Sequence, residues 1–329
     1  MQKRKKVVVI GGGTGSFTVL SGLKKYKNLD LTSIVSMADD GGSTGVLRDE
    51  YGVLPPGDIR QCLVALSEAD YVTRDLFGFR FSSGSLRGHN FGNIFISALE
   101  KMTGDFNVSL RSISKVLKVR GRVLPVTFDN VHLVAELKNG KKLLGQSAIA
   151  DCRSFCYEIK KIYFNKIAKA NPEALLAIQD ADLIVVGPGS FYSSLAPNFL
   201  VRGISEAVIK ARAKKIFICN LMNQFGQTDN FTVSDFVTAM ENFILSGVFH
   251  HVLYNTKLPP RSLLKKYSDE GYPVLSPFDL ATDKRYYRLI GVNLISDSVP
   301  KIVKGDPIKR TLIRHDPDKL AKAIVSLLK

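Results

Sequence analysis

The chain has 329 residues, of which 45% are hydrophobic, and its 46 Lys and Arg against 30 Asp and Glu give a formal net charge of +16. This composition predicts a substantial buried core and excludes a disordered chain. No apolar run approaches the ~20 residues of a membrane span, and the basic start is followed by an apolar run too short for a secretory signal. The spacing of the four cysteines fits no zinc site. We therefore expect a cytoplasmic protein with reduced, mostly buried thiols.

The excess of basic residues permits nucleic-acid binding, but these residues are scattered along the chain. No helix-turn-helix, zinc-finger or aromatic RNA-binding motif accompanies them. A positive field that attracts an anionic small molecule explains the charge equally well. We predict no nucleic-acid partner.

The chain begins with a strand, a glycine-rich turn and a helix. Lys6–Ile10 is a short apolar strand, Gly11–Ser16 forms the turn, and Phe17–Tyr26 has helical spacing of apolar residues. This order is the first unit of a doubly wound fold, and its glycines let backbone N–H groups approach a phosphate at a helix N-terminus. The spacing departs from the dinucleotide-binding fingerprint and lacks the Walker lysine, and a tight turn without a ligand is the alternative. The candidate phosphate-binding residues are Gly12, Gly13 and Thr14.

A second strand, Leu31–Met37, leads into a stretch rich in glycine, hydroxyl and carboxylate side chains that extends to Arg60. We predict that residues 35–60 form a loop that wraps a phosphorylated ligand, with the adjacent Asp39 and Asp40 as candidate ligands of a metal ion. A helix is expected over Ile59–Leu66, with Asp58 either as its N-cap or as a ligand contact. The candidate binding residues here are Asp39, Asp40, Ser43, Thr44 and Arg60, and Asp39, Asp40 and Asp58 are candidate catalytic residues.

The turn Gly88–Asn93 precedes an amphipathic helical stretch, Ile94–Met102. It presents His89, Asn90 and Asn93 between two glycines, which favours a binding turn. His89 is also a candidate general acid or base.

The period of the apolar residues changes to strand alternation over about residues 116–150, where we predict a small antiparallel β insertion. Asn139-Gly140 indicates a type I′ hairpin turn within it. Ile159–Phe164 is predicted as a further strand. Asn171 is expected to cap a short helix with Pro172 at its first position.

Three more strands are expected at Leu183–Val186, Ile216–Cys219 and Val252–Tyr254. Each is followed by glycine, serine or asparagine, and polar strand ends that recur in this way indicate a single crevice at one edge of a parallel sheet. Their candidate binding residues are Gly187, Gly189, Ser190 and Asn220.

We therefore predict a Rossmann-like, doubly wound α/β fold with a mostly parallel sheet, in one large domain over residues 1–329. A helix is expected over Phe231–Phe243. A basic and less patterned segment follows over about 257–329, where Tyr286–Arg288 and Lys309-Arg310 could contact a base or a phosphate. A closing helix over Lys319–Leu328 is expected to be capped near Asp316.

These motifs resemble the bacterial gluconeogenesis factor family, the CofD-like branch related to 2-phospho-L-lactate transferase. The resemblance extends from the first strand to Thr256. Its motifs are GGGTGS (Gly11–Ser16), MADDGGSTG with the later Arg48, PPGDIRQCL (Pro55–Leu63), GHNFGN (Gly88–Asn93), GPGSFYSSLAPN (Gly187–Asn198) and CNLMNQ (Cys219–Gln224).

The resemblance implies a Rossmann-like sheet and a UDP-sugar, especially UDP-N-acetylglucosamine, in the crevice. It further implies a role in cell shape and cell-wall synthesis during growth on gluconeogenic carbon sources, without an established reaction. Gly12, Gly13 and Thr14 would then bind the diphosphate, and Asp39 and Asp40 would meet ribose hydroxyls or a metal. Cell-wall synthesis proteins and, in a homo-oligomer, further copies of the chain are the candidate partners.

The transferase branch implies an alternative, the Mg²⁺-dependent transfer of a phospholactyl group onto a deazaflavin alcohol. Asp39 and Asp40 would then hold Mg²⁺, and His89 or Asp58 would activate the acceptor. Transferases have Asn-Thr-Gly before the paired aspartates, whereas this chain has Ser36-Met37-Ala38, which favours the regulatory branch. The chain departs from that branch after CNLM, where Asn223–Thr228 replaces TQPGET and puts the role of this loop in doubt.

Overall fold

The core of the protein is a parallel sheet. The computed structural model describes residues 4–151, 159–274, 286–298 and 312–328. The strands of this sheet are β1 (Lys5–Gly11), β2 (Leu29–Val35), β3 (Arg122–Pro125), β7 (Leu183–Val186), β8 (Lys214–Ile218), β9 (His251–Asn255) and β10 (Arg288–Val292). They pair in parallel in the order β10-β9-β8-β7-β1-β2-β3. The chain order reverses between β1 and β7, as in doubly wound folds, and this confirms the predicted Rossmann-like α/β class.

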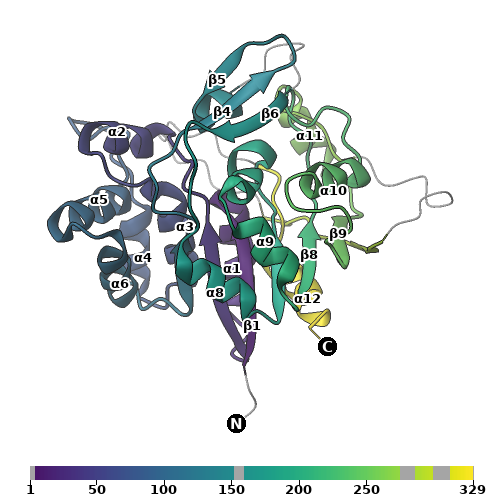
Figure 1. The fold of residues 1–329 in the computed structure, drawn as a ribbon, viewed down its shortest axis with the longest axis horizontal. Coiled ribbons are helices and arrows are strands. Elements are labelled where there is room, and N and C mark those ends of the chain that lie inside the picture. Colours follow the sequence, from purple (N-terminus) through teal and green to yellow (C-terminus); the bar gives the residue numbers. More distant parts are fainter. Residues whose placement is uncertain (1–3, 152–158, 275–285, 299–311, 329) are drawn as a thin grey trace.

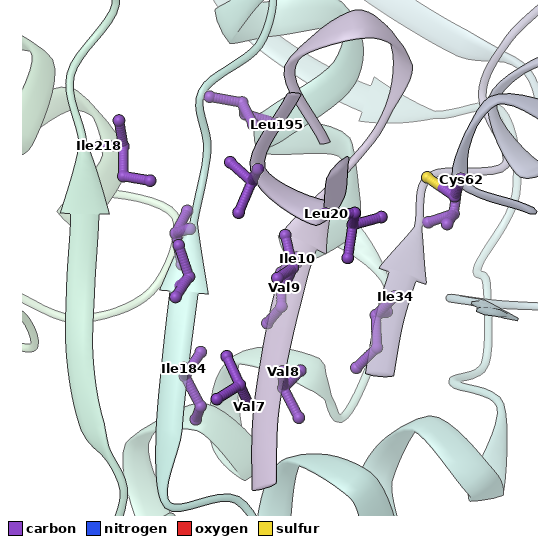
Figure 2. Close-up of a cluster of buried hydrophobic side chains, with 14 of the residues drawn as sticks. Val7, Val8, Val9, Ile10, Leu20, Ile34, Cys62, Ile184, Leu195 and Ile218 are labelled. Atoms are coloured by element: carbon purple, nitrogen blue, oxygen red, sulfur yellow. The ribbon is translucent and has the colours of Figure 1, made fainter. Parts of the chain in front are cut away.

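β1 is buried on both faces, which explains why its sequence is a continuous apolar run instead of an alternating one. Figure 2 shows its side chains Val7 to Ile10 between Ile34 of β2 and Ile184 of β7, with Leu20 and Leu195 close by. The central strand is therefore held by hydrophobic packing, and its glycine-rich end is positioned on a rigid support.

Helices pack around the sheet. Within the described residues, none has the length and apolar character needed to cross a bilayer. The helices are α1 (Gly13–Leu23), α2 (Gly42–Tyr51), α3 (Pro56–Leu66), α4 (Tyr71–Gly78), α5 (Phe91–Thr103), α6 (Phe106–Val116), α7 (Gln146–Ala150), α8 (Pro172–Gln179), α9 (Ile204–Lys210), α10 (Val233–Glu241), α11 (Arg261–Tyr267) and α12 (Pro317–Ser326). Figure 1 shows α2, α4, α5 and α6 grouped on one side of β1, and α10 and α11 near β8 and β9 on the other side.

A second, antiparallel sheet lies above the main one in Figure 1. It consists of β4 (Leu133–Leu137), β5 (Lys142–Leu144) and β6 (Ile159–Phe164), paired in the order β5-β4-β6. The strands of this sheet are not the ones predicted for the insertion over 116–150. β3 belongs to the main sheet because it pairs in parallel with β2, residues 146–150 form α7, and β6 supplies the third strand.

The turn of this hairpin is not of type I′. The N–H of Gly140 donates to the carbonyl of Leu137 at 2.9 Å, and the N–H of Leu137 donates to the carbonyl of Lys141 at 2.9 Å. Gly140 is left-handed with φ of 85°, whereas Asn139 is not among the described residues with positive φ. A type I′ turn needs positive φ at both central residues, so the loop is of the three-residue kind with a glycine bulge.

Several predicted helix ends are confirmed, whereas the loop expected over residues 35–60 is wrong as a continuous loop. Asn171 caps α8 by accepting from the N–H of Glu173, and Asp316 caps α12. The stretch over 35–60 is not a continuous loop, because α2 and the start of α3 lie within it. The N-cap of α3 is Pro55, and Asp58 stands in the first turn of the helix.

The C-terminal segment is more regular than its sequence suggests, since it contributes α11 and the edge strand β10. Tyr286 is exposed there, and Lys309-Arg310 lie outside the described residues. Cys62 and Cys219 are free and buried, as expected. Cys152 and Cys156 lie outside the described residues.

Candidate functional site

A cavity of about 330 Å³ opens where β1, β7 and β8 end. This is the carboxyl edge of the sheet at the point where the strand order reverses, the usual ligand position in doubly wound folds. Seven of the residues predicted from sequence line the cavity. They are Gly12, Gly13, Thr14, Asp58, Gly189, Ser190 and Asn220.

The N-terminus of α1 points its backbone at this cavity. Gly12 is the N-cap of α1 and has no side chain to satisfy the first N–H groups of the helix. Gly13 has a left-handed φ of 57°, a conformation that glycine adopts at no steric cost. Exposed N–H groups and the helix dipole at such an end attract negative charge. The arrangement suits a phosphate or diphosphate.

Asp58 lies beside this helix end. Its carboxylate accepts a hydrogen bond from the backbone N–H of Gly13. A Cβ atom placed on Gly12 would lie 2.3 Å from Asp58 Oδ2, so the glycine is what lets the carboxyl group approach. Burial raises the pKa of Asp58 to about 8, and the nearby charge of Asp39 contributes to the increase. Asp58 is thus protonated over much of the neutral range and does not repel a phosphate on the helix.

Asp39 is the second member of this acid pair. It accepts hydrogen bonds from the N–H of Gly41 at 3.0 Å and from the hydroxyl group of Thr44. Burial raises its pKa, and the neighbouring charge of Asp40 acts in the same direction. The structure therefore couples Asp39 with Asp58 through space, a pairing that the adjacency of Asp39 and Asp40 in sequence does not reveal.

Asp40 points to a different part of the molecule. Its two carboxylate oxygens accept from the N–H groups of Gln146 at 2.9 Å and Ser147 at 2.8 Å. These groups begin α7, so Asp40 ties the antiparallel sheet to the end of β2. Among the described residues, no group of three or more His, Cys, Asp and Glu side chains is arranged to hold a metal ion. A metal site on Asp39 and Asp40 remains a prediction.

Replacement of Asp40 by alanine is expected to lower the free energy of unfolding by about 2 kcal/mol, because two backbone N–H groups lose a charged acceptor. Urea denaturation measures the change. Asp40→Asn retains one acceptor oxygen and should cost roughly half as much. If Asp40→Ala leaves stability unchanged and instead makes ligand binding insensitive to magnesium, the main task of this carboxylate is metal binding.

A polar network lies next to the cavity without lining it, and its members are Arg60, Asn93, Thr44 and Asn90. Arg60 Nε donates to Asn93 Oδ1 at 2.8 Å, and Asn93 Nδ2 donates to Thr44 Oγ1 at 3.3 Å. Asn90 caps α5 by accepting from the N–H of Asn93. Asn90, Asn93 and Thr44 are buried and hydrogen-bonded to other protein groups. Their contacts join α2, α3 and α5 behind Asp39.

His89 and Ser43 complete this network. Ser43 Oγ lies 3.4 Å from His89 Nδ1 and accepts from the N–H of Asn90 at 3.2 Å. Neither side chain is among those that line the cavity, and Gly187 is also outside its wall. The predicted site residues therefore fall into two groups, one that lines the cavity and one that supports its wall. Asp58 belongs to the first group, and its neighbour Asp39 belongs to the second.

Arg48, from the DDGGSTG motif region, is a buried tie between elements. Its Nε donates to Asn130 Oδ1 at 3.0 Å, and its Nη1 donates to the backbone carbonyl of Asp39 at 3.4 Å. Burial lowers the pKa of Arg48, and the charges of Asp40 and Asp39 oppose this effect. The guanidinium thus fixes the backbone that carries the two aspartates.

The structure adds cavity residues that the sequence interpretation did not single out. Ser194 stands on a π-helical turn, Phe191–Leu195, within a motif that was recognised. His315 comes from the segment before α12 and had no binding signal beyond its polar type. The added wall residues are Gln61, Gln146, Ser194, Tyr267, Arg314 and His315.

A second cavity, of about 550 Å³, lies along the ends of β8 and β9. Asn220 and Leu221 line both cavities, so the two adjoin. Tyr254, Lys257 and Tyr272 contribute to the second one. A ligand longer than the first cavity therefore has adjoining space along the same edge of the sheet.

Comparisons with known proteins agree with this architecture. Residues 7–298 match the family 2-phospho-L-lactate transferase CofD. The chain is 40% identical to the gluconeogenesis factor of Bacillus subtilis, covering 100% of both chains. It is also 40% identical to the putative gluconeogenesis factor of Aquifex aeolicus, covering 99% of this chain and 97% of the relative. The crystal structure of a UPF0052 family member from Bacillus halodurans superimposes with a TM-score of 0.88 at 36% identity, over 99% of this chain and 100% of that one.

Proposed function

Because this chain belongs to the CofD family and, within it, to the gluconeogenesis factors, we propose that it is a cytoplasmic regulatory protein that binds a UDP-sugar, with UDP-N-acetylglucosamine as the first candidate. The observation that carries the proposal is the glycine-capped N-terminus of α1, which faces a cavity at the topological switch point. The diphosphate would bind there. The binding would report the supply of cell-wall precursors, and the role would be the control of cell shape and wall synthesis during gluconeogenic growth.

The size and chemistry of the site support a nucleotide sugar. A cavity of about 330 Å³ is in the range of small-molecule sites, and the adjoining cavity provides room for a second moiety. Gly189 and Ser190 line the wall next to the start of α1, and Ser190 Oγ lies within hydrogen-bonding distance of Gln224 Oε1, at 3.3 Å. Backbone N–H groups, hydroxyl groups and amides together suit a ligand with both phosphates and hydroxyls.

The acid pair favours a second candidate function, a transferase-like reaction at phosphate. Asp39 and Asp58 repel each other when both are charged, and a cation would relieve that repulsion. If Mg²⁺ enters with a phosphorylated ligand, Asp58 and Asp39 are the carboxylates that fit it, because Asp40 is engaged by α7. The acceptor in this alternative is a deazaflavin alcohol.

Isothermal titration calorimetry distinguishes the two functions. We expect micromolar binding of UDP-N-acetylglucosamine that leaves the ligand intact, and weaker binding of ADP-glucose. Saturable binding of a deazaflavin alcohol, lost on addition of a chelator, would favour the transferase. Failure of every one of these compounds to bind would refute both functions.

Gly12→Ala should weaken UDP-sugar binding about 100-fold, or roughly 2.7 kcal/mol. The new methyl group would overlap the Asp58 carboxyl group, which accepts from the N–H of Gly13, and would force a shift at the helix end proposed to bind the phosphate. Gly78→Ala on α4, where a Cβ atom has nothing within 4 Å, is the matched control and should bind as the wild type does. Equal affinities in the two variants would move the phosphate site away from α1.

A further inference from the structure

Two residues of the cavity wall each carry an acceptor atom that has no protein partner in the described part of the chain. The atoms are Asn220 Oδ1 and His315 Nε2, and both are inaccessible to solvent. Leaving a polar atom buried without a hydrogen bond costs free energy, so a pair of such atoms at one cavity points to a ligand that satisfies them.

The hydrogen bonds on the other side of each group fix the role of these atoms. Asn220 Nδ2 donates to the carbonyl of Gly189 at 3.0 Å, which directs the oxygen of the amide away from that carbonyl as an acceptor. The ring of His315 forms a hydrogen bond with the backbone of Cys219. This bond raises the pKa of His315, which is the effect expected when a ring N–H donates to a carbonyl oxygen. Since Nε2 has no partner, the donor is Nδ1, and Nε2 of the neutral ring carries a lone pair.

His315 keeps this state across the physiological range. It is 8% exposed, and burial lowers its pKa to about 4. A charged imidazolium would offer a donor, whereas the neutral ring offers an acceptor. The cavity wall thus carries backbone donors at the start of α1, the guanidinium of Arg314, and acceptors on Asn220 and His315. Leu221, Met222 and Ile313 line the cavity as apolar neighbours.

We propose that His315, with Asn220, is a specificity-determining residue that accepts hydrogen bonds from O–H or N–H donors on the non-phosphate part of the ligand. This inference rests on the proposed function, because the ligands used to test it are UDP-sugars and their parts. The donors can belong to the sugar or to the nucleoside, and these two sources share the same chemistry.

Two variants of His315 separate the acceptor from the structural bond. His315→Asn keeps an amide N–H at the position of Nδ1, where it can donate to Cys219, and removes the acceptor at Nε2. His315→Gln carries its amide out to the position of Nε2 and retains an acceptor there. We expect His315→Asn to weaken UDP-N-acetylglucosamine about tenfold, His315→Gln to weaken it less than threefold, and both to bind inorganic pyrophosphate as the wild type does.

The ligand series locates the donor. Loss of affinity for UDP as well as for the UDP-sugar places the donor on the nucleoside, and loss for the UDP-sugar alone places it on the sugar. An equal loss for pyrophosphate, or an equal loss in both variants, would show that His315 acts through the structure of the protein and would overturn the assignment.

Nitrogen-15 NMR of histidine-labelled protein provides a readout that does not depend on affinity. The spectrum of the free protein should show His315 protonated at Nδ1 and unprotonated at Nε2, and a bound ligand should shift the Nε2 resonance toward the hydrogen-bonded range. Binding of the UDP-sugar with no shift overturns the role of His315 and leaves the proposed function intact. A shift with a different sugar phosphate or nucleoside diphosphate, and no binding of any UDP-sugar, keeps the role and overturns the proposed function. A proton on Nε2, or no shift with any of these compounds, overturns the inference.

Discussion

Gly15→Ala should destabilise the protein by about 3 kcal/mol or more, although alanine is favoured over glycine by about 1 kcal/mol inside a helix. Gly15 lies in the first turn of α1, where a Cβ atom would be 1.9 Å from the carbonyl oxygen of Pro188 and 2.5 Å from its carbon. Both atoms belong to backbone, so the contact cannot be relieved by rotating a side chain. α1 or the turn after β7 must move.

Thermal and urea denaturation measure this effect, with Gly78→Ala as the control. Gly78 is also helical, and no atom lies within 4 Å of its added Cβ atom, so this variant should be neutral or more stable by up to about 1 kcal/mol. If the two variants have the same stability, α1 does not pack against the turn after β7 as closely as described.

Asp58→Asn should remove the loss of stability that Asp58 causes between about pH 6.5 and pH 8. The pKa of Asp58 is raised from 3.8 to about 8 in the folded protein, so above pH 4 the unfolded chain binds fewer protons there than the folded chain. Raising the pH therefore favours unfolding at this residue, by at most about 1.4 kcal/mol per pH unit. Below about pH 6.5 the buried His315, whose pKa is lowered to about 4, contributes the opposite slope. The wild type should therefore lose stability above pH 6.5. The asparagine variant, which has no proton to lose, should be flatter and more stable at pH 8.

Urea titrations at pH 5, 6.5 and 8 test this expectation. Asp70→Asn is the control, because the Thr73 hydroxyl lowers the pKa of Asp70 and this residue therefore contributes only on the acid side. The wild-type slope should persist in that variant. A wild-type protein whose stability rises from pH 6.5 to pH 8, with the same slope in Asp58→Asn, would show that Asp58 is ionised in the folded state.

The sheet could be predicted from sequence because its strands are apolar runs buried on both faces. β7 has the bounds expected, and β1 differs only at its ends. α2 could not, because Gly42, Ser43, Thr44 and Gly45 are poor helix formers. Ser43, Thr44 and Arg48 are buried, and the tertiary contacts that bury them outweigh the weak local preference.

The site was predicted in part, for a physical reason. Polar residues after a parallel strand converge at one edge of the sheet, and that rule correctly placed Gly12, Gly189 and Asn220 around one cavity. The rule does not separate residues that line the cavity from those that support its wall, so Asn93 and Thr44 were grouped with them. His315 reaches the cavity by tertiary packing from the far end of the chain, and neither spacing nor periodicity indicates that contact.

The attachment of α7 to Asp40 has a thermodynamic consequence. Gln146 opens α7, donates its N–H to Asp40 and lines the cavity, so α7, which follows β5, supplies part of the cavity wall. A ligand that touches this wall would bind only while α7 is docked. Local undocking of α7 then has a free energy that grows with ligand concentration, by about 2.7 kcal/mol at 100 times the dissociation constant. This helix would be held in place when ligand is abundant and would undock more often when it is scarce.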